Sequence, residues 1–152
     1  MTRLRIIFWR SYYAIINPFL RIYYKIFHPK TRGVKCLIKN GDTFLLVRLA
    51  YAHKQWVFPG GGVDKHESYE SAAWRELKEE TAVKPQSLSF FGQYESTGEY
   101  KRDTVQCFYG ETDSIIIRFD PLEIAEAKWS PRENFPLDCS GSVSKIMALY
   151  DN

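Results

Sequence analysis

The sequence predicts an α/β domain in which helices cover both faces of a mixed β-sheet. Three observations support this prediction: short apolar segments separated by turn signals, one helix-like segment near the middle of the chain, and a second one at its end. The 152 residues favour a single domain large enough to bury a hydrophobic core. Apolar residues make up 45% of the chain and charged residues 26%, as in ordinary globular proteins.

Charge is distributed unevenly along the chain. Residues 1–41 contain nine Lys or Arg and no acidic residue, whereas the remaining 111 residues contain 12 basic and 18 acidic side chains. The two parts carry +9 and −6, which gives the net charge of +3. This asymmetry predicts a basic arm, residues 1–32, that meets an anionic surface or docks on the acidic body at 33–152.

Large apolar and aromatic side chains dominate residues 4–27 of the arm. Arg10 and Arg21 lie inside this segment, and a charge at the centre of a membrane span costs roughly 2.5 to 3.5 kcal/mol on insertion scales. A membrane-spanning helix is therefore not predicted. Pro18 would break a single helix but suits the first position of a new one, so we expect two amphipathic helices at residues 3–16 and 18–27.

Several environments remain open for the arm. Amphipathic helices mostly pack on protein, so the favoured interpretation is packing on its own domain or on a second subunit of a homodimer. A basic aromatic helix also suits a membrane interface, which would make residues 1–30 a peripheral membrane contact. Binding of nucleic acid is ranked last because the body lacks the usual stacking and groove-binding motifs.

The three cysteines are widely spaced and form no CxxC pair, which argues against a zinc knuckle or a thioredoxin-like site. An odd number of cysteines without a secretory leader is typical of a reducing compartment. We therefore expect a cytoplasmic protein, with the membrane surface as the alternative that the arm leaves open.

The first half of the body predicts a β-hairpin and a short third strand. Residues 33–39 and 43–49 are strand candidates on either side of Asn40-Gly41-Asp42, a strong turn signal. After a polar loop, residues 56–58 form a short strand that Pro59 and three glycines stop.

The second half predicts one central helix among further strands. Residues 68–81 have helical apolar spacing, with Ser68 as the N-terminal cap. The remaining expected elements are strands at 88–95, 104–112, 114–119 and 126–130 and a final helix at 140–150.

Three carboxylates carry the first chemical signal. Glu76, Glu79 and Glu80 are spaced i, i+3 and i+4, which places them on one face of the central helix, where they repel one another. A hard divalent cation such as Mg²⁺ prefers oxygen ligands of this kind and shares its shell with substrate phosphates. The glycine-rich loop that leads into the helix lets backbone approach a ligand closely. Taken alone, the glutamates would fit a solvated helix face equally well.

The spacing of residues from Gly61 to Val83 favours a metal site over a solvated helix face. From Gly61, five residues lead to Glu67 and seven more to Arg75-Glu76-Leu77-Lys78-Glu79-Glu80-Thr81-Ala82-Val83. This pattern resembles the Nudix box, with six of seven single-residue positions matched. The departure is Ala82, where the pattern has glycine, and we expect alanine to alter the local turn geometry but not the ligands. The resemblance implies a Nudix-like α/β/α sandwich with a mixed sheet.

The resemblance also implies roles for individual residues. Glu76, Glu79, Glu80 and the carbonyl of Gly60 would be metal ligands, with Mg²⁺ as the ion and Mn²⁺ as a substitute. The general base would be Glu79 or a later glutamate, for which we favour Glu123. Glu67 and Arg75 would support the site through an ion pair.

The implied reaction is hydrolysis of a diphosphate linkage in a nucleoside diphosphate derivative, namely a nucleoside triphosphate, a nucleotide sugar or a dinucleoside polyphosphate. The alternatives are a nucleotide-sensing domain of low activity and a hydrolase recruited to a membrane by the arm. Arg48 is a candidate for contacting phosphate, and core packing competes with base stacking for Trp56 and Phe58. The full set of candidate substrate-binding residues is Arg48, Tyr51, Trp56, Phe58 and Tyr100.

Overall fold

A six-stranded mixed sheet forms the centre of the protein in a computed structural model, which describes residues 30–50, 55–96 and 102–152. The strands are β1 (Lys30–Asn40), β2 (Thr43–Leu49), β3 (Trp56–Val57), β4 (Ser89–Ser96), β5 (Arg102–Glu111) and β6 (Ile124–Pro131). Their order is β3-β2-β1-β5-β4, and β6 pairs along β2. The β1–β5 pair is parallel and the other pairs are antiparallel, so the sheet is mixed as expected.

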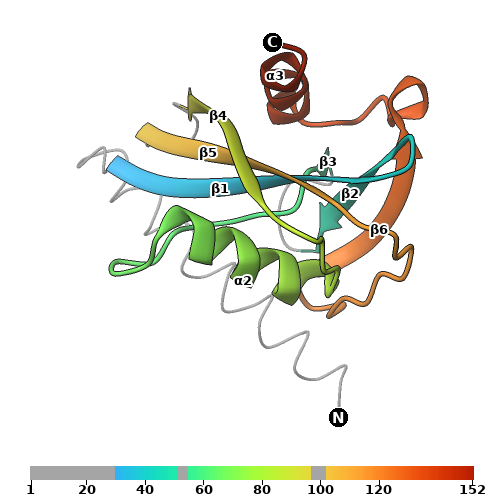
Figure 1. Cartoon of the computed structure of the whole chain (residues 1–152), viewed down its shortest axis with the longest axis horizontal. Helices are drawn as coiled ribbons and strands as arrows, with labels where there is room; N and C mark the ends of the chain where they lie inside the picture. Colours follow the sequence, from blue (N-terminus) through green and yellow to red (C-terminus); the bar gives the residue numbers. More distant parts are fainter. Residues whose placement is uncertain (1–29, 51–54, 97–101) are drawn as a thin grey trace.

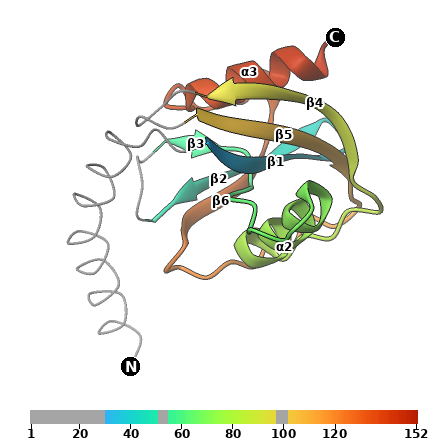
Figure 2. The same ribbon diagram turned by 90° about the vertical axis from the view of Figure 1, so that its left-hand side faces the viewer.

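Two helices cover opposite faces of this sheet, α2 (Tyr69–Thr81) on one side and α3 (Gly141–Tyr150) on the other (Figures 1 and 2). A short 3-10 helix, η2 (Arg132–Asn134), precedes α3. Each face has its own hydrophobic core, one built around Leu77 of α2 and the other around Ile146 of α3. The α/β/α sandwich predicted from the sequence is therefore confirmed.

Strand β1 contributes to both cores because successive side chains of a strand point to opposite faces. Val34, Cys36 and Ile38 pack in the core on the α2 side, whereas Leu37 packs in the core on the α3 side. By the same alternation Lys35 points to the α3 face, in the middle of an otherwise apolar stretch.

The glycine-rich loop after β3 runs along β1 beyond Lys39 and Asn40, the two β1 residues that pair with β2. The N–H of Cys36 donates to Pro59 O at 2.8 Å, and that of Val34 donates to Gly61 O at 2.9 Å. Gly60, between these two, has a φ of +134°, and a Cβ there would lie 2.2 Å from Val34 O. Glycine is thus required at this position for both reasons, and the loop is held against the sheet by backbone hydrogen bonds.

Most predicted elements are present with small shifts at their ends. The hairpin strand at 43–49 is confirmed to the residue, and Ser68 caps α2 as expected, since its hydroxyl accepts a hydrogen bond from the Ser71 N–H at 3.1 Å. The arm helices expected at 3–16 and 18–27 lie outside the described residues.

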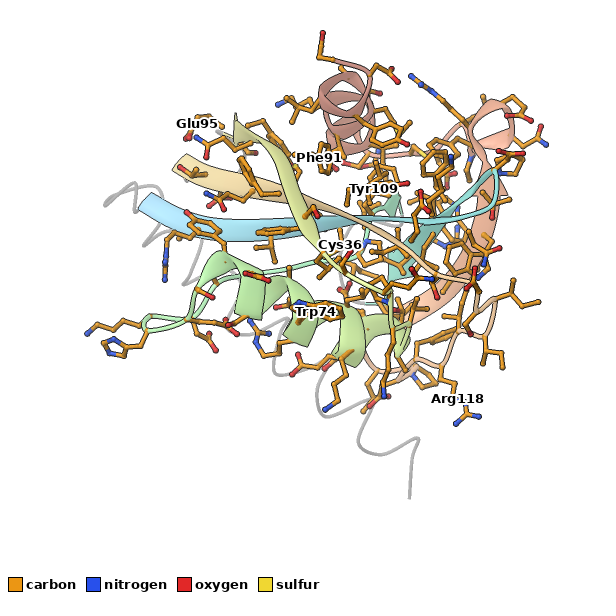
Figure 3. The ribbon with its side chains drawn as sticks, in the orientation of Figure 1. Cys36, Trp74, Phe91, Glu95, Tyr109 and Arg118 are labelled. Carbon is orange, nitrogen blue, oxygen red and sulfur yellow. The ribbon has the colours of Figure 1, made fainter. Side chains whose placement is uncertain are left out.

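The strand predicted at 114–119 is wrong. Both edges of β5 are already paired, with β1 and β4, so the following chain leaves the sheet. Ile115 and Ile116 are 69% and 62% exposed, and the side chain of Arg118 projects away from the sheet (Figure 3). The segment crosses the end of α2 instead, where the Arg118 N–H donates to Thr81 O at 2.9 Å.

Candidate active site

Three carboxylates of α2 lie at one side of the helix with different exposure. The Glu79 side chain is 53% exposed, the Glu76 side chain is 15% exposed, and Glu80 as a whole residue is 6% exposed. The three carboxylates on this helix face therefore differ in solvent exposure: Glu79 faces solvent, and Glu80 lies beneath the glycine loop.

Arg75 joins the loop to the helix. Its guanidinium donates to both carboxylate oxygens of Glu67 at 2.9 Å and to Gly62 O at 2.9 Å. It also donates to Glu76 at 2.7 Å and to Glu79 at 3.3 Å. The structure therefore contains the expected ion pair, and the hydrogen bonds from Arg75 hold the pKa of Glu67 down at about 2.

Glu80 is a buried carboxyl with a perturbed pKa. Burial raises its pKa to about 7, whereas the Lys35 ammonium and a hydrogen bond from the Gly60 N–H act in the opposite direction. The neighbouring charges of Glu76 and Glu123 act in the same direction as burial and are part of the same net shift. A carboxyl with a pKa raised toward neutral by burial beside other charged groups is a candidate functional group.

Gly61 lets the Glu76 carboxyl lie against the loop. A Cβ at Gly61 would lie 2.7 Å from the carboxyl carbon and both carboxyl oxygens of Glu76. Glycine is therefore needed at Gly61, the first position of the box, because it leaves room for the Glu76 carboxylate of α2.

Glu123 comes from a distant part of the chain and approaches the same acids. It lies in the turn before β6, where its carbonyl accepts a hydrogen bond from the Ala50 N–H at 2.9 Å. Partial desolvation of this exposed residue raises its pKa, and the charges of Glu79, Asp120 and Glu76 act in the same direction. The fold thus places Glu123 within electrostatic reach of two carboxylates of α2.

The donor set fits a hard divalent cation in its chemistry, because it consists of carboxylates beside a backbone carbonyl. Within the described parts of the chain, however, no three acidic, His or Cys side chains are arranged to hold a metal ion. Arg75 engages Glu76 and Glu79, and the Gly60 N–H engages Glu80. Binding a cation would require these carboxylates to share or exchange those partners.

Comparison with known proteins places the chain in a family. A family model described as the NUDIX domain matches residues 29–148, which is well over half of the chain. The chain belongs to the Nudix family. The Nudix resemblance read from the box is thereby confirmed, and the expectation of a Nudix-type pyrophosphohydrolase is confirmed at the level of the family.

Individual Nudix proteins are similar over different lengths. An RNA pyrophosphohydrolase of Pelagibacter ubique is 31% identical over 131 residues, covering 72% of this chain and 82% of that protein. An 8-oxo-dGTP diphosphatase of Escherichia coli is 39% identical over 59 residues, covering 38% of this chain and 46% of that protein. The crystal structure of a MutT protein from Methanosarcina mazei has a TM-score of 0.73 at 23% identity, covering 83% of this chain and 96% of that one.

The Nudix family generally uses a divalent metal ion and binds nucleotide substrates, which agrees with the carboxylates of α2. In the part of the chain that the structure describes, no helix has the length and apolar character needed to span a membrane.

Beside the Nudix box, the candidate substrate residues fall into three groups. Phe58 is fully buried in the α3-side core and makes an edge contact with Phe135, contacts that favour core packing over base stacking. Trp56 is also buried, and the cations of Arg48 and Lys128 lie 5.1 and 4.5 Å from its ring centroid. Tyr51 and Tyr100 lie outside the described residues.

Arg48 is already paired in the structure. Its guanidinium forms an ion pair with Glu126 of β6 and lies 3.8 Å from Asp138. A phosphate at this place would have to compete with two carboxylates, so Arg48 is less available than the sequence suggested.

A cavity of about 760 Å³ adjoins the glycine loop of this Nudix domain. It is bordered by β1, by the glycine loop, and by Tyr94 and Val105 of β4 and β5. Lys35 also lines it, and sequence reasoning missed this residue. Burial lowers the pKa of Lys35, and Glu80 opposes that shift. The signal that could have revealed Lys35 is a single charge within the apolar stretch from Val34 to Ile38.

Proposed function

We propose that this protein is a Mg²⁺-dependent hydrolase that cleaves a diphosphate linkage in a nucleoside diphosphate derivative. The observation that carries the proposal is the electrostatic coupling of Glu80 and Glu123 to Glu76, beside a glycine loop and a nucleotide-sized cavity. The activities named for two relatives, RNA pyrophosphohydrolase and 8-oxo-dGTP diphosphatase, support a substrate with a nucleoside 5′-phosphate chain.

Glu76, Glu79, Glu80 and the carbonyl of Gly60 would hold Mg²⁺, and Mn²⁺ could replace it. When bound, the ion supplies Lewis-acid stabilisation of the charge that develops on the phosphate oxygens. The chain's own residues orient this site: Arg75 fixes Glu67 and Gly62, and the Gly60 N–H fixes Glu80.

The general base is Glu79 or Glu123, and we favour Glu123. A base that works near neutral pH benefits from a pKa raised above the ordinary carboxyl value. Partial desolvation and the charges of Glu79 and Glu76 raise the pKa of Glu123, whereas the Glu79 carboxylate accepts a hydrogen bond from Arg75. Glu123 would accept the proton of the attacking water at one of its carboxylate oxygens.

The cavity supports binding of the nucleoside part of the substrate. Its volume of about 760 Å³ lies within the range of small-molecule sites. Tyr94 and Val105 offer apolar surface, while the glycine loop connects the cavity to the carboxylates. This arrangement suits a nucleoside triphosphate, a nucleotide sugar or a dinucleoside polyphosphate.

A substrate panel tests the proposal. Purified protein is incubated with Mg²⁺ and with each of these three substrate classes, and phosphate products are quantified. Glu79→Gln and Glu80→Gln should each lower kcat/KM by at least about a hundredfold, as expected for groups that stabilise developing charge. Glu133→Gln, an exposed glutamate of η2, serves as the control and should leave turnover unchanged. Full turnover in both box variants would refute the metal-site assignment.

A further inference from the structure

Lys35 is a lysine built into the wall of the candidate active site. Its Nζ donates to Phe58 O at 2.9 Å and to Gly60 O at 3.0 Å. These carbonyls belong to the segment that the neighbouring β1 N–H groups already hold through Pro59 and Gly61. The ammonium therefore lies in a fixed place beside the carbonyl that we propose as a metal ligand.

The ammonium is also positioned toward the substrate side. Lys35 and the glycines at 60–62 line the same cavity. A lysine ammonium carries three N–H donors, and the described residues provide hydrogen-bond acceptors for two of them, Phe58 O and Gly60 O. Among the described residues the third donor has no acceptor, so it is the one that a ligand in the cavity would engage.

A phosphate in this site would come close to that donor. If the Gly60 carbonyl held Mg²⁺ as proposed, a substrate phosphate on the same ion would lie beside that carbonyl, because Mg²⁺ is commonly bound by protein oxygens and substrate phosphates together. Nζ lies 3.0 Å from the same carbonyl oxygen. Lysine is a compact cation on a flexible stem and commonly contacts phosphate as a point charge.

We propose that Lys35 binds a non-bridging phosphate oxygen of the substrate at the junction between the cavity and the glycine loop. The inference rests on the proposed function, because it assumes a phosphate substrate at this site. The competing role is purely structural, in which Lys35 only ties the loop to β1 through the two carbonyls.

Two substitutions separate these roles. Lys35→Gln keeps amide N–H donors for the carbonyls but removes the charge, and Lys35→Met removes both. Lys39→Met is the matched control, since Lys39 lies four residues further along the same strand, by the hairpin turn. Thermal unfolding of each variant verifies that it is folded.

Inhibition by imidodiphosphate, a pyrophosphate analogue that is not hydrolysed, measures phosphate binding with Mg²⁺ present. The inhibition constant should rise at least tenfold in Lys35→Gln and in Lys35→Met, and kcat/KM for the best panel substrate should fall by a similar factor. Lys39→Met should match the wild type. Binding of Mn²⁺ to the substrate-free protein, followed by electron paramagnetic resonance, should be no weaker in Lys35→Gln than in the wild type.

Wild-type inhibition and turnover in Lys35→Gln would overturn the inference and leave the proposed function intact. A loss of Mn²⁺ binding in Lys35→Gln would also overturn it, because Lys35 would then act on the metal ligand and not on the phosphate. A wild-type protein that hydrolyses no panel substrate and is not bound by imidodiphosphate would overturn the proposed function together with this inference.

Discussion

The backbone N–H of Gly60 donates a 2.8 Å hydrogen bond to a carboxylate oxygen of Glu80. This bond joins the glycine loop to the buried end of the carboxylate face of α2. Because Gly60 is itself fixed against Val34 of β1, the position of Glu80 is determined by the sheet as well as by its own helix. The contribution of this carboxyl to the pH dependence of stability can be isolated in metal-free protein by comparing wild type with Glu80→Gln.

Metal-free protein should lose stability between about pH 4.5 and pH 7 through Glu80. Its pKa is about 7 in the folded protein against an ordinary 4.5, so the unfolded chain releases this proton first. The folded state binds more protons in this window, and stability therefore falls as pH rises. We compare the unfolding free energy of the wild type with that of Glu80→Gln. The difference between them (wild type minus variant) should decrease by on the order of 3 kcal/mol as the pH rises through this window, because each unit of pKa difference corresponds to 1.36 kcal/mol.

Urea unfolding in EDTA at several pH values measures this difference. Glu70→Gln, an exposed glutamate in the first turn of α2, is the control for the removal of one carboxylate from this helix. A pH-independent difference for Glu80→Gln would show that Glu80 is ionised in the folded protein at pH 5.

Gly61→Ala should impair activity far more than stability. The added Cβ would lie 2.7 Å from the Glu76 carboxyl, which is the end of a flexible side chain and can move away. We expect the unfolding free energy to change by less than about 1 kcal/mol, while kcat/KM falls by more than about tenfold because a carboxylate is displaced. Gly62→Ala is the matched control, since a Cβ there meets nothing within 4 Å. Equal activities in the two variants would contradict this role of Gly61.

Local signals along the chain were sufficient for most of the fold and for the carboxylate face. Asn40-Gly41-Asp42 marked the hairpin, and Gly41 has the positive φ of 54° that the turn signal implies. The box spacing placed Glu76, Glu79 and Glu80 together because helical periodicity depends only on sequence separation.

Long-range contacts were less accessible to sequence reasoning. The Ile115 to Ile117 run has strand propensity, but both edges of the preceding strand β5 are occupied, and the run lies outside the sheet. Lys35 acquires its role only when the loop carbonyls fold back onto β1 from more than twenty residues away. Phe58 directly precedes the glycine loop, but its side chain points into the core. To choose between core packing and substrate stacking for this residue, one must know which face of the sheet α3 covers.

Ala82→Gly should stabilise the protein by about 0.5 to 1 kcal/mol. We expected the alanine to alter the turn after α2, but Ala82 adopts φ 52° and ψ 13°, the left-handed geometry that favours glycine, and its N–H donates to Lys78 O at 3.1 Å. The turn is therefore retained with backbone strain. Glycine removes this strain, and its larger chain entropy when unfolded offsets part of the gain.

Chemical denaturation of Ala82→Gly, compared with Ala125→Gly at an exposed position of β6, measures this strain. The control should be destabilised, because glycine weakens a strand. Destabilisation of both variants would mean that Ala82 carries no strain.

Phe58→Ala should act through stability and not through substrate binding. Phe58 is fully buried and packs with Phe135 and Phe44 in the α3-side core. Its truncation should lower the unfolding free energy by about 3 to 5 kcal/mol, whereas Phe90→Ala, on a side chain that is 54% exposed, should cost less than about 1 kcal/mol. The milder Phe58→Leu keeps the core filled with apolar atoms and should leave KM within about twofold of wild type. If Phe58 stacked on the substrate base, Phe58→Leu would instead raise KM severalfold with little change in stability. The substitution would then remove an aromatic contact with the ligand, and no contact of the core.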